Sequence, residues 1–156
     1  MSYEQSFAEI SVRRFNPSDL NRIIELENAS FTVDSFTENT FLDYYHKCSD
    51  LFIVAEITEK VIGYMITCIL SEKGLIVSIA VDPNYRRKRV GRTLVDWTIS
   101  SLKECGVKFA ELRTRKTNIE GNGFWANLGF IPTITIPHFY SDGAEALQMV
   151  KVLGDS

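Results

Sequence analysis

One stretch of the sequence bears most directly on the fold: Ile79-Ala80-Val81-Asp82-Pro83-Asn84-Tyr85-Arg86-Arg87-Lys88-Arg89-Val90-Gly91-Arg92. Its apolar start predicts the end of a buried strand, Asp-Pro stops that strand, and helical spacing of apolar residues begins at Val90. The first turn of a helix leaves backbone N–H groups unpaired and carries a partial positive charge. Four basic residues just before such a turn favour a site for an anion with several phosphate oxygens. A basic run alone is typical of a solvated loop or a nucleic-acid patch, but α/β sheets bind ligands between a strand end and a helix start.

Strand and helix patterns alternate on both sides of this stretch. Strands are predicted at residues 10–15, 51–57, 61–70, 75–81, 107–115, 131–136 and 146–152, and helices at 17–31, 38–45, 90–105 and 118–128. Short links between residues 51 and 81 predict an antiparallel meander, whereas a helical crossover makes 75–81 and 107–115 parallel neighbours. We therefore expect an α/β (α+β) fold in one domain, residues 1–156, with a mixed, largely antiparallel sheet of about seven strands flanked by about four helices.

Composition excludes several classes of protein. The chain has 156 residues, of which 45% are hydrophobic, and a net charge of −3, so it can bury a full core and is not built to coat nucleic acid. No apolar run approaches the ~20 residues that span a bilayer. Residues 1–9 carry two acids and no base, unlike a signal peptide. We expect a cytoplasmic protein that binds neither nucleic acid nor membrane, as a monomer or homodimer.

The cysteines give no sign of a disulfide framework or a metal site. Cys48, Cys68 and Cys105 are odd in number and far apart, and His46 and His138 cannot complete a metal set with them. We expect three reduced, mostly buried thiols and no metal.

The basic stretch resembles a known family signature. Val81-x-Pro83-x-Tyr85-Arg86-Arg87-x-x-Val90-Gly91 is similar to the acetyl-CoA motif of the GCN5-related N-acetyltransferases (GNAT). The resemblance implies that the backbone of Ile79, Ala80 and Val81 pairs with the pantetheine arm. It also implies that the loop and helix start hold the pyrophosphate of CoA, through Arg86, Arg87, Lys88, Arg89, Val90, Gly91 and Arg92. Arg89 replaces a family glycine, and a side chain there costs roughly 1–2 kcal/mol if the position needs a positive φ.

A second block supports the first. Residues 118–130 resemble the family pattern Asn-x-x-Ala-x-x-Leu-Tyr-x-x-x-Gly-Phe. The resemblance implies that Asn118 caps a helix and bonds the pantetheine region, and that Trp125 lies near the CoA sulfur where the family has tyrosine. An indole N–H can donate a hydrogen bond but cannot deliver a proton.

Two further segments point to a subfamily. Residues 26–31 resemble the Ile-Glu-x-x-Ser/Ala-Phe segment of RimI-type enzymes, and residues 140–149 resemble the Tyr-Tyr-x-Asp-Gly-Glu-Asp-Ala-x-x-Met end of protein N-terminal acetyltransferases. An Asp-Gly pair alone is an ordinary hairpin signal. The resemblance spans about residues 12–152 and implies that Phe31, Val33 and Tyr140 contact the substrate N-terminus.

The chemistry favours an α-amine as the acceptor. An α-amine has a pKa of ~7.7–8.0 and a lysine amine ~10.4, so an enzyme without a strong base should prefer the former. Arg113 occupies the position where RimI-like relatives have glutamate, and Glu111 shares its strand face. Glu111 and Tyr140 are the candidate catalytic residues, but a surface position is the expectation for each of Glu27, Asp34 and Glu111.

The sequence thus predicts an enzyme that transfers an acetyl group from acetyl-CoA to the α-amine of protein or peptide N-termini. No residue resembles a covalent nucleophile, so direct attack in a ternary complex is expected. Two alternatives stay open. One is a lysine or small-amine acetyltransferase on the same fold. The other is a non-catalytic CoA-binding module, which is favoured by Trp125 and Arg113 because they replace two groups with catalytic roles in relatives.

Overall fold

The computed structural model describes residues 9–31 and 35–154, and their element order is the expected one. The strands are β1 (Ser11–Arg14), β2 (Phe52–Ile57), β3 (Lys60–Leu70), β4 (Lys73–Val81), β5 (Phe109–Arg115), β6 (Ile131–Ile136) and β7 (Ala146–Val152). The α-helices are α1 (Leu20–Ser30), α2 (Glu38–Lys47), α3 (Val90–Glu104) and α4 (Ile119–Asn127). Short 3-10 turns, η1 (Pro17–Asp19), η2 (Ser49–Leu51) and η3 (Pro83–Tyr85), precede α1, β2 and the loop before α3.

The strands form one seven-stranded sheet in the order β1-β2-β3-β4-β5-β7-β6. All neighbours are antiparallel except β4 and β5, which confirms the mixed sheet and the parallel crossover. The β4–β5 ladder is short: it runs from Lys73 opposite Phe109 to Leu75 opposite Glu111. Two residues further along β4, the pairing with β3 skips Val77, which is a β-bulge. Beyond this point β4 and β5 diverge.

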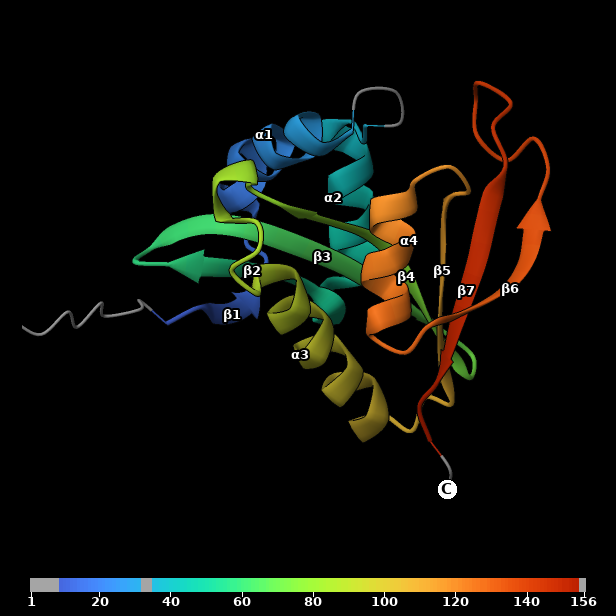
Figure 1. The fold of residues 1–156 in the computed structure, drawn as a ribbon. Coiled ribbons are helices and arrows are strands. Elements are labelled where there is room, and N and C mark those ends of the chain that lie inside the picture. Colours follow the sequence, from blue (N-terminus) through green and yellow to red (C-terminus); the bar gives the residue numbers. More distant parts are fainter. Residues whose placement is uncertain (1–8, 32–34, 155–156) are drawn as a thin grey trace, which may run out of the picture.

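Helices cover both faces of the sheet (Figure 1). The core between the sheet and α3 and α4 includes Leu94 and Trp125, and the core under α1 and α2 includes Ile23 and Phe41. Below, these are called the α3–α4 face and the α1–α2 face. Three predicted caps are confirmed: the side chain of Asn16 caps η1, which leads into α1, and those of Thr37 and Asn118 cap α2 and α4.

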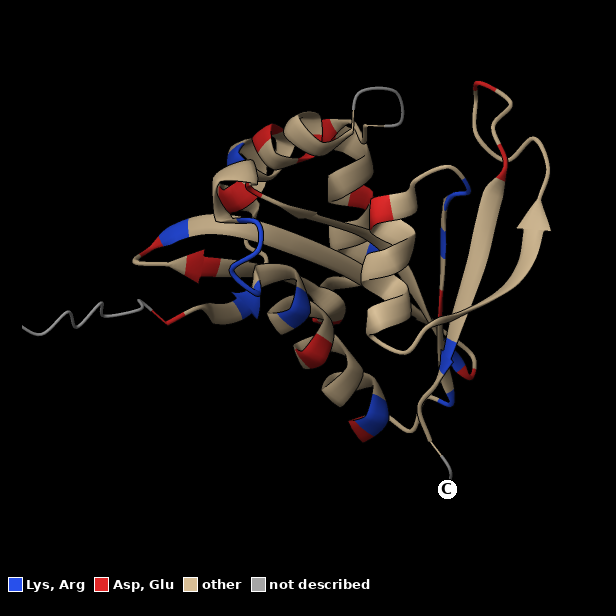
Figure 2. Ribbon diagram, viewed as in Figure 1, with Lys and Arg blue, Asp and Glu red and all other residues tan. Residues whose placement is uncertain are grey.

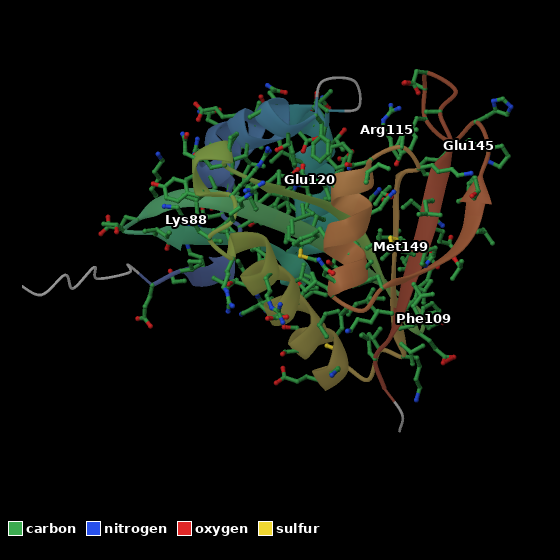
Figure 3. All side chains as sticks on the ribbon, in the orientation of Figure 1. Lys88, Phe109, Arg115, Glu120, Glu145 and Met149 are labelled. Atoms are coloured by element: carbon green, nitrogen blue, oxygen red, sulfur yellow. A yellow bond between two sulfur atoms is a disulfide. The ribbon has the colours of Figure 1, made fainter. Side chains whose placement is uncertain are left out.

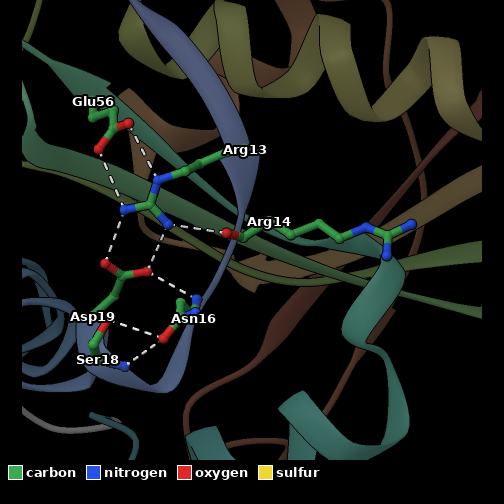
Figure 4. Close-up of polar contacts among 6 residues, drawn as sticks. All are labelled: Arg13, Arg14, Asn16, Ser18, Asp19 and Glu56. Atoms are coloured by element: carbon green, nitrogen blue, oxygen red, sulfur yellow. Dashed lines mark hydrogen bonds and ion pairs between the residues drawn. The ribbon is translucent and has the colours of Figure 1, made fainter.

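The start of α1 is fixed to the sheet by an ion-pair network (Figure 4). The guanidinium of Arg13 donates to both oxygens of Asp19, at 2.9 and 3.0 Å, and to the carboxylate of Glu56 on β2. The backbone N–H of Asn16 also donates to Asp19, at 2.8 Å, which completes a capping box. Burial acts to raise the pKa of Asp19, but the hydrogen bonds from Arg13 and Asn16 outweigh it and lower the pKa below its usual value.

The prediction of three reduced thiols was wrong. Cys48 and Cys68 form a disulfide, and Cys105 is the exposed free cysteine. Twenty residues separate the two half-cystines, but the turn from α2 into β2 and the hairpin into β3 bring their Cα atoms to 5.2 Å. Strand pairing creates this proximity, so the spacing of the cysteines does not reveal it.

None of the helices within the described residues is long and apolar enough to cross a membrane.

We predict that Asp19→Asn lowers the free energy of unfolding by about 1–3 kcal/mol, because it weakens charged hydrogen bonds at a buried cap. The folded-state pKa of Asp19 is depressed, so this stability is present at neutral pH and is lost as the pH falls through that pKa. Denaturant titrations at several pH values should therefore show a difference from wild type that shrinks in acid. Asp43→Asn, an exposed control on α2, should change stability by less than about 0.5 kcal/mol. Equal effects of the two substitutions would contradict the role of Asp19.

Candidate functional site

The divergence of β4 and β5 creates the central feature of the site. Among the described residues, the strand that pairs with β4 beyond Leu75 is β3, so the edge of β4 toward β5 has no strand partner there. Backbone N–H and C=O groups seek partners when they are not exposed to bulk water. The side chains of Ile79 and Val81 pack against the α3–α4 core, and Ala80 is buried on the opposite face. The end of β4 therefore suits an extended ligand with its own donors and acceptors.

The loop after β4 has the geometry of an anion cradle. Residues 86–89 are exposed and form the blue loop before α3 in Figure 2. Arg87 and Arg89 both have positive φ, 65° and 66°. Arg89 thus adopts the left-handed conformation for which the family uses glycine, at a cost of roughly 1–2 kcal/mol. The first turn of α3 starts with Thr93 N–H donating to Arg89 C=O at 2.9 Å, so the N–H groups before it have no acceptor within the helix.

A partly buried ion pair holds the start of this loop in place. Asp82 accepts from the Asn84 backbone N–H at 2.8 Å and from the Arg22 guanidinium at 2.5 Å. Arg22 also donates to the C=O of Val61 at 2.8 Å, which ties α1 to β3. Burial acts to raise the pKa of Asp82, but the bonds from Asn84 and Arg22 outweigh it and lower the pKa. The sequence analysis missed this anchor, because the two partners lie 60 residues apart.

The basic side chains of the loop make only weak contacts. Arg86 donates to Ser30 Oγ at 3.4 Å, Lys88 lies 5.9 Å from the Tyr85 ring centroid, and Arg92 pairs with Asp96 at 3.7 Å. Exposed contacts of this kind contribute ~0–1 kcal/mol each. A phosphate group can therefore replace them at little cost.

The starts of α3 and α4 lie against each other. A Cβ added at Gly91 would stand 3.2 Å from Cζ of Phe124, so glycine permits this close approach. The Asn118 side chain accepts from the Gly121 N–H at 3.0 Å, which confirms it as the cap of α4. Trp125 is 5% exposed, and its ring centroid lies 5.0 Å from that of Phe124 and 5.1 Å from that of Phe130. Trp125 is thus a core residue, and its contact with the CoA arm, like that of Asn118, stays a prediction.

Glu111 lies on the α1–α2 face where β4 and β5 diverge. It is 6% exposed, so the reading as a surface carboxylate was wrong. Its carboxylate pairs with Lys73 at 3.3 Å and with Arg113 at 3.0 Å. Ala110 and Leu112 point into the opposite core, which places Glu111 and Arg113 together on this face, as the alternation of the strand predicts. The Nε–H of Arg113 is buried and donates to no acceptor among the described residues.

The predicted substrate contacts lie at one edge of the molecule. In Figure 1 the end of α1 and the β6–β7 hairpin both occupy the upper edge. Phe31 caps α1, with its N–H donating to Glu27 C=O at 2.8 Å. The Arg115 guanidinium lies 4.4 Å from the Tyr140 ring centroid and pairs with Asp142 at 3.0 Å, which fixes the hairpin to β5. Figure 3 shows Arg115 far from Lys88 of the basic loop. Val33 lies outside the described residues.

A buried polar chain on the α1–α2 face was not foreseen. The Tyr64 hydroxyl donates to Oε1 of Glu27, and the Phe36 N–H donates to Oε2 at 2.7 Å. The Tyr64 hydroxyl is also 2.9 Å from Ser78 Oγ on β4. Glu27 is 1% exposed, and its expected surface position was wrong. Burial raises the pKa of Glu27. The signal was present in the sequence, because Glu27 continues the apolar stripe of Leu20, Ile23 and Phe31 at helical spacing.

Comparisons with known proteins agree with this geometry. The family model described as the acetyltransferase (GNAT) family matches residues 20–130. N-alpha-acetyltransferase 30 of Dictyostelium discoideum is 30% identical over 88% of this chain and 74% of its own length. The crystal structure of Ard1 from Thermoplasma volcanium has a TM-score of 0.89 and 27% identity, covering 94% of this chain and 99% of that one. Chaetomium thermophilum Naa20 in complex with a bisubstrate analogue has a TM-score of 0.84 and 25% identity, covering 92% of this chain and 86% of that one.

We predict that Gly91→Glu weakens acetyl-CoA binding by more than about tenfold, which corresponds to about 1.4 kcal/mol. The new carboxylate stands at the helix start that is predicted to hold phosphates, and its Cβ crowds Phe124. Titration calorimetry on the folded variant measures the effect. Ser100→Glu, which places the same charge at an exposed position near the other end of α3, should bind acetyl-CoA like wild type. Unchanged affinity in Gly91→Glu would remove the helix start from the site.

Proposed function

This chain belongs to the GNAT family of acetyltransferases, and we propose that it transfers an acetyl group from acetyl-CoA to the α-amine of protein or peptide N-termini. The observation that carries the proposal is the divergence of β4 and β5. The basic start of α3 follows the end of β4, and the β6–β7 hairpin with Tyr140 packs against the end of β5. The relatives named N-alpha-acetyltransferase support the choice of acceptor.

The donor is held on the α3–α4 side in this proposal. The N–H groups at the start of α3, with the basic side chains of residues 86–89, bind the pyrophosphate of CoA. The free edge of β4 at Ile79–Val81 pairs with the pantetheine arm, which Asn118 approaches from the start of α4. These groups support the proposal because they include helix-start N–H groups without an acceptor in the helix, exposed cations and a strand edge without a strand partner.

The acceptor approaches from the α1–α2 face. Phe31 and Tyr140 flank its first residues, and the phenol of Tyr140 bonds the peptide backbone while its ring covers the first side chain. Contact with backbone more than with side chains suits an enzyme that accepts several N-terminal sequences. Glu111 lies where the two substrates meet and stays a candidate proton acceptor, with its carboxylate held by Lys73 and Arg113.

The transfer proceeds by direct attack of the amine on the thioester. Cys68 and Cys48 are joined to each other, and Cys105 caps the far end of α3, so none of the three supplies a thiol nucleophile where β4 and β5 diverge. A thiol has a pKa of ~8.5, so the CoA thiolate is a tolerable leaving group near neutral pH. The protein then needs to orient the amine, bind the carbonyl and accept one proton.

A cytoplasmic location is part of the proposal. The disulfide between Cys48 and Cys68 is unusual for this location, because thiols are kept reduced in most cytosols. Intracellular disulfides are common chiefly in hyperthermophiles. Cell fractionation combined with thiol labelling of the extracted protein decides the question.

We predict that an α-amine is acetylated faster than a lysine amine of the same peptide. The difference in pKa of roughly 2.6 corresponds to about 3.5 kcal/mol of deprotonation cost at neutral pH. The assay measures kcat/KM on peptides that differ in their first two residues, with an N-terminally blocked peptide bearing lysine as the control. Faster transfer to the blocked peptide would replace N-terminal acetylation with the lysine or small-amine alternative. Acetyl-CoA binding with no transfer to either peptide or to small amines would favour the non-catalytic module.

We also predict that Tyr140→Phe reduces kcat/KM for peptide by roughly 5–30-fold, through loss of contacts worth ~1–2 kcal/mol. Affinity for acetyl-CoA should not change, because the hairpin lies far from the basic loop (Figure 3). Tyr45→Phe removes a hydroxyl from α2 at the opposite edge of the sheet, beside Phe15, and should leave peptide kinetics unaltered. Wild-type kinetics in Tyr140→Phe would exclude the hydroxyl from substrate binding.

A further inference from the structure

A chain of hydrogen bonds leads from the diverging strands to the buried Glu27. Ser78 Oγ lies 2.9 Å from the Tyr64 hydroxyl, which donates to Oε1 of Glu27. Tyr64 and Glu27 are 0% and 1% exposed, whereas Ser78 is half-buried. The chain therefore has one end at the site and the other in the core.

Ser78 stands where the substrates are proposed to meet. It is three residues beyond Leu75, the last residue of β4 that pairs with β5, and directly follows the bulge at Val77. Its bond to Tyr64, a member of the α1–α2 core, places the hydroxyl on the α1–α2 face. This is the face from which the amine approaches in the proposed function.

The chemistry of the three groups matches proton transfer. Oε1 of Glu27 accepts a hydrogen bond from the Tyr64 hydroxyl, and Oε2 accepts one from the Phe36 N–H. Two acceptor oxygens are the pattern of an ionised carboxylate, which is able to take up a proton. Burial and the Glu27 carboxylate raise the pKa of Tyr64 well above its usual range, so the phenol loses its proton only when it gains another. Serine and tyrosine hydroxyls both donate and accept, which a relay requires.

The charged groups near Glu27 in the described residues are engaged elsewhere. On its own helix, Arg22 pairs with Asp82 and Glu25. From the basic loop, Arg86 reaches Ser30 on the following turn. Within the described residues, Tyr64 is the titratable group that contacts the Glu27 carboxylate from the sheet, so a proton arriving at Glu27 comes through it.

We propose that Ser78, Tyr64 and Glu27 form a relay that takes the proton from the acceptor amine during acetyl transfer, an inference that rests on the proposed function. The amine nitrogen attacks the thioester carbon, the C–N bond forms, and the C–S bond breaks with its electron pair going to sulfur. The amine proton passes to Ser78 Oγ, the Ser78 proton to Tyr64, and the Tyr64 proton to Oε1 of Glu27. The same path returns the proton to solvent or to the CoA thiolate.

The relay is tested with isosteric variants in steady-state assays over a pH range. Glu27→Gln keeps an acceptor for the Phe36 N–H, Tyr64→Phe keeps the buried ring, and Ser78→Ala touches no bond of Glu27. Each should lower kcat at neutral pH by at least about tenfold, within the ~10²–10⁴-fold that general bases contribute. The KM for acetyl-CoA should not change, and the loss should shrink at high pH because solvent hydroxide takes over. Ser78→Thr, which keeps the hydroxyl, should retain activity.

Several outcomes would overturn the relay. If Ser78→Ala had the kcat of wild type while Glu27→Gln had a lower kcat, the Glu27 carboxylate would have only a structural role, through its hydrogen bond from the Phe36 N–H. A loss that is independent of pH would also indicate a structural role. Recovery at high pH confined to Glu111→Gln would assign the proton to Glu111 instead. Thermal melts confirm that each variant is folded, and Ser78→Ala serves if Tyr64→Phe does not fold.

The test of the relay can fail independently of the test of the proposed function. If wild type acetylates lysine faster than an α-amine, the N-terminal assignment fails, but the same variants still judge the relay on the lysine acceptor. If the α-amine is preferred and the variants keep wild-type kcat, the relay fails and the proposed function stands.

Discussion

The divergence of β4 from β5 is the constraint on which the rest of the structure depends. A parallel pair of strands would normally continue its ladder, but here three residue pairs form, and β4 bulges against β3 two residues beyond the last of them. A backbone N–H or C=O group beyond this point that lacks a strand partner needs another hydrogen-bond partner. A buried polar group without a hydrogen bond costs about 1–3 kcal/mol. The fold therefore keeps an opening in the middle of its sheet, where a ligand backbone can complete the ladder.

Helix α1 connects the two sides of this opening. Its first turns are fixed by Arg13 to Asp19 and by Arg22 to Asp82, so the helix is tied both to the sheet edge and to the loop before α3. Its last turn carries Glu27 and ends at Phe31, on the side proposed to bind the acceptor. One helix thus sets the position of the basic loop and of Phe31 relative to the same strands.

Local signals predicted the fold, and long-range pairing determined what they missed. Caps such as Asn16, Thr37 and Asn118 are read from neighbouring residues, and each begins its helix as expected. The family pattern has glycine at the position of Arg89, which raised the possibility of a positive φ, and Arg89 adopts one. The disulfide and the Arg22–Asp82 pair join residues that only the sheet topology brings together. The misread burial of Glu27 and Glu111 has another cause. Carboxylates are almost never buried unless they are paired, and Tyr64 and Lys73, which pair with these two, lie 37 and 38 residues away in the sequence.

The disulfide changes the unfolded chain more than the folded one. It closes a loop of 20 residues that contains η2, β2 and most of β3, the strand that carries Tyr64. In chain-entropy terms, a loop of this length removes disorder from the unfolded state worth about 3 kcal/mol. This contribution comes from fewer accessible conformations of the unfolded polypeptide, and not from contacts at the site. A reducing environment that opens the disulfide would thus lower the free energy of unfolding by a similar amount, although none of the hydrogen bonds described for the site involves Cys48 or Cys68.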